Sequence, residues 1–165
     1  MTKILIFGNS GSGKSTLAKS MSLANSLAHL DLDTIAWEPV HPPVRKSLDA
    51  AGALIQDFIA INDSWVIEGC YADLLELVTV SANQVIFLNL SIQDCIANAK
   101  NRPWEPHKYP SKQAQDSNLE MLIEWISQYD MRQDSFSRAA HEALFDQFIG
   151  QKVMHRTNQS LPAIL

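Results

Sequence analysis

Cysteine is scarce in this chain: Cys70 and Cys95 are the two that it has, and their spacing fits neither a metal-binding pair nor a redox pair. We therefore expect both thiols to be buried in the protein interior. The five histidines are scattered without the short spacings that metal ligands show, so the sequence marks no zinc site.

Long apolar runs and an excess of basic residues are missing as well. No apolar stretch is long enough to cross a bilayer, and the N-terminus lacks the charged region, apolar segment and cleavage site of a signal peptide. We therefore expect a cytoplasmic protein without a membrane partner. The formal net charge of −5 argues against a nucleic-acid partner, because binding along a phosphate backbone needs a basic face. The sequence gives no indication of the oligomeric state.

What the chain does contain is an alternation of strand-like and helix-like segments. Its 165 residues, 46% of them apolar, have the size and composition of a single globular domain spanning residues 1–165. Strands are expected at 3–7, 26–33, 64–69, 83–90 and 151–156, and helices at 14–24, 47–61, from about 73, at 92–100 and over 117–148, with a break near 135 as an alternative. The proline-rich segments 38–44 and 101–112 are expected to be irregular.

This alternation predicts a three-layer α/β fold, in which a five-stranded parallel sheet carries helices on both faces. In such sheets, ligands bind beyond the carboxyl ends of the strands. Gly8, Asp33 and Glu68 all fall at predicted carboxyl ends. We therefore expect the chemistry of the protein to gather at this edge of the sheet.

Residues 8–15, GNSGSGKS, match the phosphate-binding pattern G-x-x-x-x-G-K-[ST] of P-loop proteins. Small residues let such a loop wrap around an anion with its backbone N–H groups pointing inward, and the next helix adds its positive N-terminal end. Lys14 is expected to bridge the β- and γ-phosphates of ATP, and the Ser15 hydroxyl to coordinate Mg²⁺. The residues assigned to nucleotide binding here are Gly8, Gly11, Ser12, Gly13, Lys14, Ser15 and Thr16.

Two carboxylates at strand ends are candidates for the rest of the site. Asp33 is expected to bind the hydroxyl of a phosphoryl acceptor or to serve as its base, with a capping role as the alternative. Asp31, two residues earlier, would share its face and is the weaker candidate. Glu68 is expected to hold Mg²⁺ directly or through water, and a capping or salt-bridged acid is the alternative.

Four segments carry a resemblance to a known family: GNSGSGKSTLA, HLDLDTIAWEP, SWVIEGCYADLLEL and QVIFLNL. They are similar to segments of the small adenylate-kinase-related P-loop proteins that are labelled DNA topology modulation proteins. The resemblance implies the P-loop NTPase fold of the nucleoside-monophosphate kinases, and it implies ATP binding. It also implies an acceptor-binding region at about 34–62 and a small lid insert at about 101–117.

Three of the five arginines acquire candidate roles from this resemblance. Arg102 begins the lid and would stack on adenine or clamp a phosphate. Arg132 lies on the predicted long helix, where related kinases place arginines, and would meet the transferring phosphoryl group. Arg156 follows the last strand, where the related fold places the adenine loop. For each of them, a solvated surface position is the alternative.

Together these features predict an ATP- and Mg²⁺-dependent phosphotransferase that moves the γ-phosphate to a small acceptor, which we expect to be a nucleotide or a nucleoside. Its expected catalytic residues are Lys14, Asp33, Arg102 and Arg132, and its expected metal ligands are Ser15 and Glu68. The alternative is a nucleotide-dependent binding or regulatory protein with little or no kinase turnover. Members of the family have Asp-Gly where this chain has Glu68-Gly69, and they carry more arginine near the lid, which favours the alternative.

Overall fold

The computed structural model describes residues 1–160, and its five strands form one parallel sheet, as the sequence predicts. The strand order across the sheet is β2 (Ala28–Asp31), β3 (Trp65–Gly69), β1 (Lys3–Gly8), β4 (Gln84–Leu88) and β5 (Gln151–His155). β1 therefore lies in the middle, hydrogen-bonded to β3 on one side and β4 on the other.

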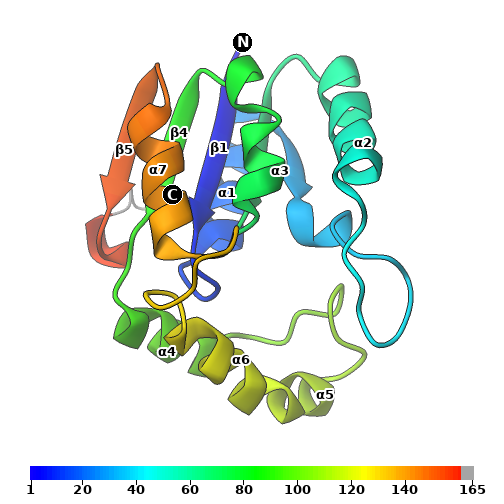
Figure 1. The fold of residues 1–165 in the computed structure, drawn as a ribbon, viewed down its shortest axis with the longest axis vertical. Helices are drawn as coiled ribbons and strands as arrows, with labels where there is room; N and C mark the ends of the chain where they lie inside the picture. The colour runs from blue at the N-terminus through cyan, green and yellow to red at the C-terminus, as the bar shows by residue number, and fades with distance from the viewer. Residues whose placement is uncertain (161–165) are drawn as a thin grey trace.

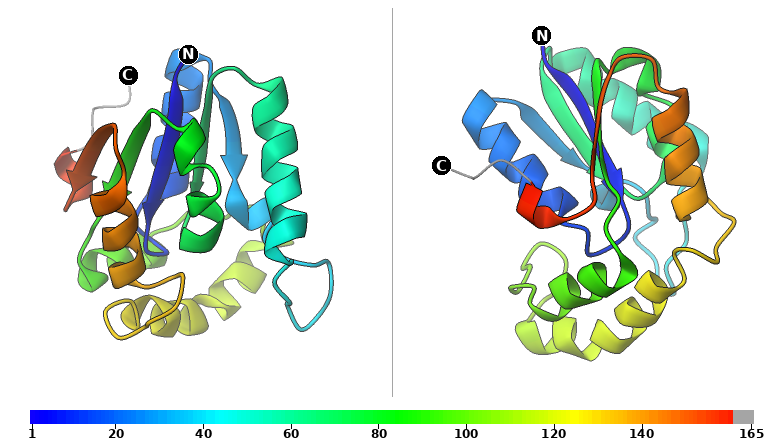
Figure 2. Two further views of the ribbon diagram at one scale, coloured as in Figure 1. Left: turned by 45° about the horizontal axis from the view of Figure 1, so that its top comes forward. Right: turned by 90° about the vertical axis from the view of Figure 1, so that its left-hand side faces the viewer.

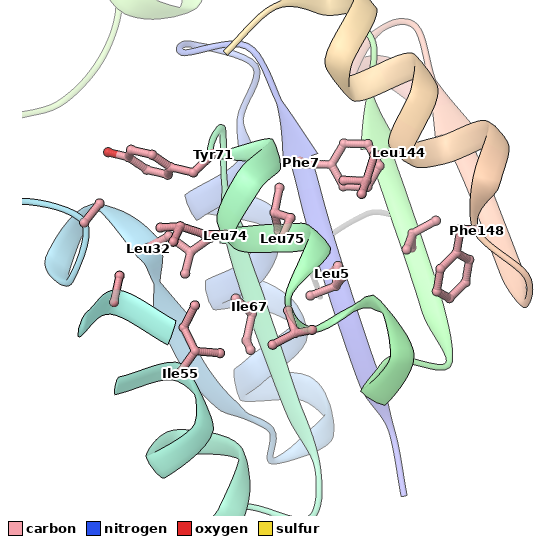
Figure 3. Packing of buried hydrophobic residues seen from close by; sticks show 14 of the residues in the cluster. Leu5, Phe7, Leu32, Ile55, Ile67, Tyr71, Leu74, Leu75, Leu144 and Phe148 are labelled. Atoms are coloured by element: carbon pink, nitrogen blue, oxygen red, sulfur yellow. The ribbon is translucent and has the colours of Figure 1, made fainter. Parts of the chain in front are cut away.

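Both faces of this sheet are covered by helices, which explains why the central strands are unbroken apolar runs. Along β1, Ile4 and Ile6 pack into one hydrophobic cluster, and Leu5 and Phe7 pack into another on the opposite face. The first cluster is completed by α1 (Lys14–Asn25) and α4 (Ile92–Lys100), and the second by α2 (Leu48–Ile61), α3 (Ala72–Glu76) and α7 (Arg138–Gln147). Figure 2 shows these layers, and Figure 3 shows the second cluster with α3 and α7 over the sheet.

Because all strands are parallel, their carboxyl ends meet at one edge of the sheet. Beyond that edge lie α4, α5 (Lys112–Ser117) and α6 (Leu119–Ser127), at the bottom of Figure 1. The segment that joins α4 to α5 occupies the predicted lid position. The ends of the strands therefore face a layer that is formed by α4, α5, α6 and the segment between α4 and α5, which we call the roof.

The predicted continuous helix over 117–148 is wrong. Asn118 separates α5 from α6, α6 ends at Ser127, and α7 begins only at Arg138, so the break expected near 135 is real and extends over 128–137. Short polar side chains stabilise the break: Asp134 accepts a hydrogen bond from the backbone N–H of Phe136 (3.0 Å), and Ser137 caps α7 by accepting one from Ala140 (3.0 Å).

The predicted second strand is too long at both ends. β2 covers four residues, and the chain then makes one 3₁₀ turn over Leu32–Thr34. Asp31 caps this turn by accepting a hydrogen bond from the backbone N–H of Asp33 at 2.9 Å. Asp33 therefore leaves the sheet edge on a turn, which places its carboxylate beyond the strand rather than at its last residue.

The prediction that both thiols are buried is confirmed in part. Cys95 is buried, and burial raises the pKa of its thiol to about 11. Cys70 is only partly buried, so the expectation holds for one of the two cysteines.

Within residues 1–160, no helix combines the length and the apolar character needed to cross a bilayer.

Ile67 tests the contribution of the second cluster to stability. It is fully buried on β3 beside Leu5 and Leu30 of the neighbouring strands, whereas Ile61, the last residue of α2, is 83% exposed. We expect Ile67→Ala to lower the free energy of unfolding by about 2–5 kcal/mol, because it leaves a cavity between sheet and helices. Ile61→Ala should change it by less than about 0.5 kcal/mol. Denaturant titration of both variants measures this, and equal losses would contradict the packing described.

Candidate functional site

The phosphate-binding loop connects β1 to α1, and its glycines adopt backbone conformations that other residues rarely adopt. Gly11 and Gly13 have φ angles of 78° and 92°. A Cβ atom on Gly11 would lie 2.4 Å from the carbonyl oxygen of Cys95. The loop is therefore compatible only with glycine at these positions, and it leads directly into the N-terminus of a 12-residue helix, where an anion is favoured.

The amide groups of three asparagines fasten this loop. Asn9 donates to the carbonyl oxygen of Ile126 (3.2 Å), and Asn98 donates to that of Gly11 (2.8 Å). Asn158 donates to the carbonyl oxygen of Ser12 (3.0 Å) and accepts a second hydrogen bond from Asn98 (2.7 Å). The loop is thus held in place by residues of α4, α6 and the segment after β5, which gives a bound anion a preorganised cradle.

A cavity of about 830 Å³ opens at the phosphate-binding loop, between the strand ends and the roof. Its lining comes from residues 10, 11, 13–17 and 19, Asp33, residues 68–70, Asn98, residues 101–109, Leu122 and Asn158. The predicted site residues that it brings together are Gly11, Gly13, Lys14, Ser15, Thr16, Asp33, Glu68 and Arg102. Gly8 and Ser12 belong to the loop without lining the cavity, and Ser12 is buried.

Lys14 and Ser15 occupy the mouth of the loop at the start of α1. The Lys14 ammonium group folds back and donates to the carbonyl oxygen of Asn9 at 2.7 Å, so it spans the loop where a phosphate would lie. The Ser15 hydroxyl donates to the carboxylate of Glu68 at 2.7 Å. Glu68 is 1% exposed, and it reaches Ser15 because β3 lies directly beside β1.

The oxygens of Ser15 and Glu68 fit a magnesium ion that is bound together with a nucleotide. Mg²⁺ prefers oxygen ligands, and it commonly takes one or two from the protein and the remainder from phosphates and water. Among residues 1–160, no three His, Cys, Asp or Glu side chains are arranged to hold a metal ion by themselves. The site thus has the composition of a nucleotide-dependent metal site rather than of an independent one.

Asp33 lines the same cavity and has a partner on each carboxylate oxygen. The Tyr71 hydroxyl accepts a hydrogen bond from the indole N–H of Trp37 (2.8 Å) and donates its single proton to one oxygen of Asp33 (2.6 Å). The Lys108 ammonium group, from the lid segment, donates to the second oxygen (2.9 Å). Burial alone would raise the pKa of Asp33, but Lys108 and Tyr71 outweigh it and hold the pKa below its usual range. Asp33 is therefore ionised.

A second carboxylate, Asp31, stands behind Asp33, with the Lys108 nitrogen 3.7 Å from one of its oxygens. Burial and the charges of Glu68 and Asp33 raise the pKa of Asp31. Burial would lower the pKa of Lys108, but Asp33 and Asp31 reverse this and raise it, so the ammonium group stays charged. Lys108 thus pairs with two neighbouring carboxylates, Asp33 and Asp31.

The arginine at the start of the lid segment forms an ion pair within that segment. Arg102, at the start of the lid, pairs with Glu105 at 3.1 Å while lining the cavity. Gln115 of α5 accepts a hydrogen bond from the backbone N–H of Glu105 (2.8 Å) and donates to the carbonyl oxygen of Pro103 (3.1 Å), which fixes this turn. Arg102 is therefore positioned over the cavity by contacts that do not involve the sheet.

Two other predicted arginines lie outside the cavity lining. Arg132 is on the irregular segment rather than on a helix; it pairs with Asp134 at 2.6 Å and stacks 3.5 Å over the ring centre of Trp125. A contact between Arg132 and a transferring phosphoryl group would require this segment to move. Arg156 follows β5 and is exposed. The proposed roles of both residues remain predictions.

A buried histidine supports one wall of the cavity. Its isolated position in the sequence gives no indication of this role. His141 of α7 has its Nε2 2.8 Å from the carbonyl oxygen of Cys70, so Nε2 carries the proton, and Nδ1 accepts from the Tyr129 hydroxyl at 2.7 Å. The rings of Phe7 and Phe87 pack against it. This network fixes the turn after β3 that contributes Cys70 to the cavity.

Lys108, Tyr71 and Asn158 are further cavity or support residues that sequence reasoning missed. Lys108 stood inside the predicted lid, and Tyr71 inside a segment that carried the family resemblance, but no spacing linked either of them to Asp33. Asn158 lies 60 residues from its partner Asn98, and no local pattern joins them.

Comparison with known proteins supports the fold. No protein-family model matches the sequence, and neither does any curated protein. Among solved structures, the chain is similar to the crystal structure of shikimate kinase from Bacteroides thetaiotaomicron, with a TM-score of 0.54 and 16% sequence identity over 94% of this chain and 86% of that chain. This likeness shows a P-loop kinase fold. The narrower family that the sequence motifs resemble remains a prediction.

The buried imidazole of His141 predicts a dependence of stability on pH. Burial lowers the pKa of His141 to about 4, whereas an unfolded chain binds the proton near pH 6.5. Between these values only the unfolded state gains the proton, so stability is full above pH 6.5 and falls by roughly 3 kcal/mol as the pH drops to 4.

His141→Gln keeps a donor for the Cys70 carbonyl and removes the titration, so its free energy of unfolding should fall less steeply with acidification. The control is His107→Gln, at an exposed lid position, which should keep the slope of the unsubstituted protein. Denaturant unfolding at a series of pH values between 4 and 7 gives all three slopes. An unchanged slope in His141→Gln would contradict the buried neutral imidazole.

Proposed function

We propose that this protein is a phosphotransferase that moves the γ-phosphate of ATP to a hydroxyl group of a small acceptor. The observation that carries the proposal is that Lys14, Ser15, Glu68 and Asp33 all line one cavity, which brings the phosphate-binding loop together with an ionised carboxylate. The fold of the shikimate kinase structure supports it, since its name describes an enzyme that phosphorylates a small hydroxyl compound.

In the proposed reaction, an acceptor hydroxyl oxygen forms a bond to the γ-phosphorus while the bond from that phosphorus to the β–γ bridging oxygen breaks, releasing ADP. Lys14 stabilises negative charge on the phosphoryl oxygens. Mg²⁺, held by Ser15 and Glu68, supplies further neutralisation of the phosphates when it is bound. Asp33 orients the hydroxyl by accepting its hydrogen bond and takes its proton as the new bond forms.

The low pKa of Asp33 limits how it acts. A carboxylate whose ionised form is stabilised by Lys108 and Tyr71 is a weak base. Its main contribution is therefore to position the hydroxyl in line with the γ-phosphorus, with proton transfer following late in the step. The Tyr71 hydroxyl, committed to the other oxygen, holds the carboxylate in that orientation.

The test is release of ADP in the presence of candidate acceptors, including nucleosides, nucleoside monophosphates, sugars and shikimate. We expect at least one of them to stimulate turnover of ATP. Lys14→Ala should weaken ATP binding or turnover by roughly tenfold or more, because it removes the charge that spans the loop. The matched control is Lys152→Ala, on the edge strand β5, which should leave both unchanged. Normal nucleotide affinity and activity in Lys14→Ala would refute the assignment.

The magnesium site has a separate test. Glu68→Gln should raise the Mg²⁺ concentration needed for half-maximal turnover and lower the maximal rate, with a smaller effect on nucleotide affinity, because the charge facing the metal is lost. Glu76→Gln, on the exposed side of α3, is the control and should behave as the unsubstituted protein. If the rate and its Mg²⁺ dependence are unchanged in Glu68→Gln, the carboxylate has a structural role only.

A regulatory protein that binds ATP with little turnover is the second candidate. The pairing of the lid cations favours it: Arg102 with Glu105, and Lys108 with Asp33. ATP binding that depends on Lys14, without stimulation by any acceptor, would identify this second function.

A further inference from the structure

The acceptor end of the cavity carries a surplus of negative charge. Asp33 lines it, Asp31 lies next to Asp33 without lining the cavity, and Lys108 is the cation that pairs with both. The other lysines of the lining, Lys14 and Lys19, come from the phosphate-binding loop and α1, on the nucleotide side. The acceptor end therefore has two carboxylates, Asp31 and Asp33, against one ammonium group.

Among residues 1–160, no arginine offsets the negative charge at the acceptor end of the cavity. Arg102 lines the cavity but is paired with Glu105. Arg45 lies within the predicted acceptor-binding region, yet its guanidinium pairs with Asp73 (3.2 Å) and lies 4.9 Å over the ring centre of Tyr71. It does not line the cavity. Arg132 and Arg138 are likewise paired, with Asp134 and Asp130.

A phosphorylated acceptor would bring a second cluster of negative oxygens beside the triphosphate. Proteins bind such groups with arginine forks or several cations, because an unpaired phosphate in a partly buried site is costly. The carboxylates of Asp31 and Asp33 would instead repel it. From this charge arrangement we infer that the acceptor is an unphosphorylated hydroxyl compound, an inference that rests on the proposed function.

Such a compound fits the contacts of Asp33. Its side chain is 42% exposed, and one of its oxygens is bound by Lys108 of the lid segment rather than by a residue of the sheet. An acceptor hydroxyl takes the place of the ammonium group on this oxygen, while Tyr71 stays on the other. Lys108 can remain beside Asp31, so that the carboxylate pair keeps its cation.

The first experiment measures binding and does not depend on turnover. The protein is saturated with a non-hydrolysable ATP analogue and Mg²⁺, and AMP, CMP, GMP, UMP and ribose 5-phosphate are titrated by calorimetry. We expect no saturable binding of these phosphomonoesters with a Kd below about 1 mM. A phosphomonoester that binds at a Kd of about 100 μM or tighter overturns the inference.

A charge variant tests the cause. Asp31→Asn removes one negative charge behind the site and keeps a side-chain oxygen to cap the turn at Asp33. It should tighten phosphomonoester binding by roughly tenfold or more, as expected for losing a unit charge at short range in a partly screened site. Asp57→Asn, on the exposed face of α2, is the control and should cause no change. Equal behaviour of the two variants would overturn the charge argument.

The second experiment compares acceptors in matched pairs: each nucleoside with its monophosphate, and each sugar with its sugar phosphate. ADP release should be stimulated at least tenfold more by the unphosphorylated member of a productive pair. A phosphorylated member that is equal or better overturns the inference and leaves the proposed phosphotransferase intact. Stimulation by no compound, with ATP binding intact, refutes the phosphotransferase itself and the inference with it.

Discussion

The carboxylate of Glu68, buried at the end of β3, is the group on which the arrangement of the site depends. A buried charge must be met by hydrogen-bond donors, and Glu68 receives one from Ser15 of the phosphate-binding loop while His29 of β2 lies 3.3 Å away. These contacts are possible only because β2, β3 and β1 are adjacent and parallel. The sheet order thus determines which side chains meet the phosphate-binding loop at this edge of the sheet.

The same sheet edge and the lid are connected by charge rather than by apolar packing. Lys108 reaches from the lid to Asp33 and Asp31, and this ion pair spans the cavity that the proposed reaction would use. An ion pair that is partly exposed contributes little to stability and is readily exchanged for another partner. The lid can therefore be closed in the described conformation and still yield its contact to an incoming hydroxyl group.

The irregular segment between α6 and α7 supports the neighbouring elements through hydrogen bonds. Its ends hold Tyr129 against His141, and its backbone at Ser135 accepts a hydrogen bond from Ala72 at the start of α3 (3.0 Å). Through His141 it also fixes the carbonyl group of Cys70. The segment therefore stabilises the turn after β3, and Arg132 serves this packing by stacking on Trp125.

The sequence by itself predicts the phosphate-binding loop and the parallel sheet with its helical layers. It also places Asp33 and Glu68 near strand ends. Each of these features depends on a local pattern of glycine, apolar and polar residues. The break after α6 was harder to locate, since the apolar spacing of Trp125, Tyr129 and Phe136 continues through it. Only the tertiary structure decided that Lys108 meets Asp33, 75 residues away, and that Asn158 fastens the loop at Ser12, 146 residues away. Such contacts join single polar side chains across the fold, and no periodicity along the chain records them.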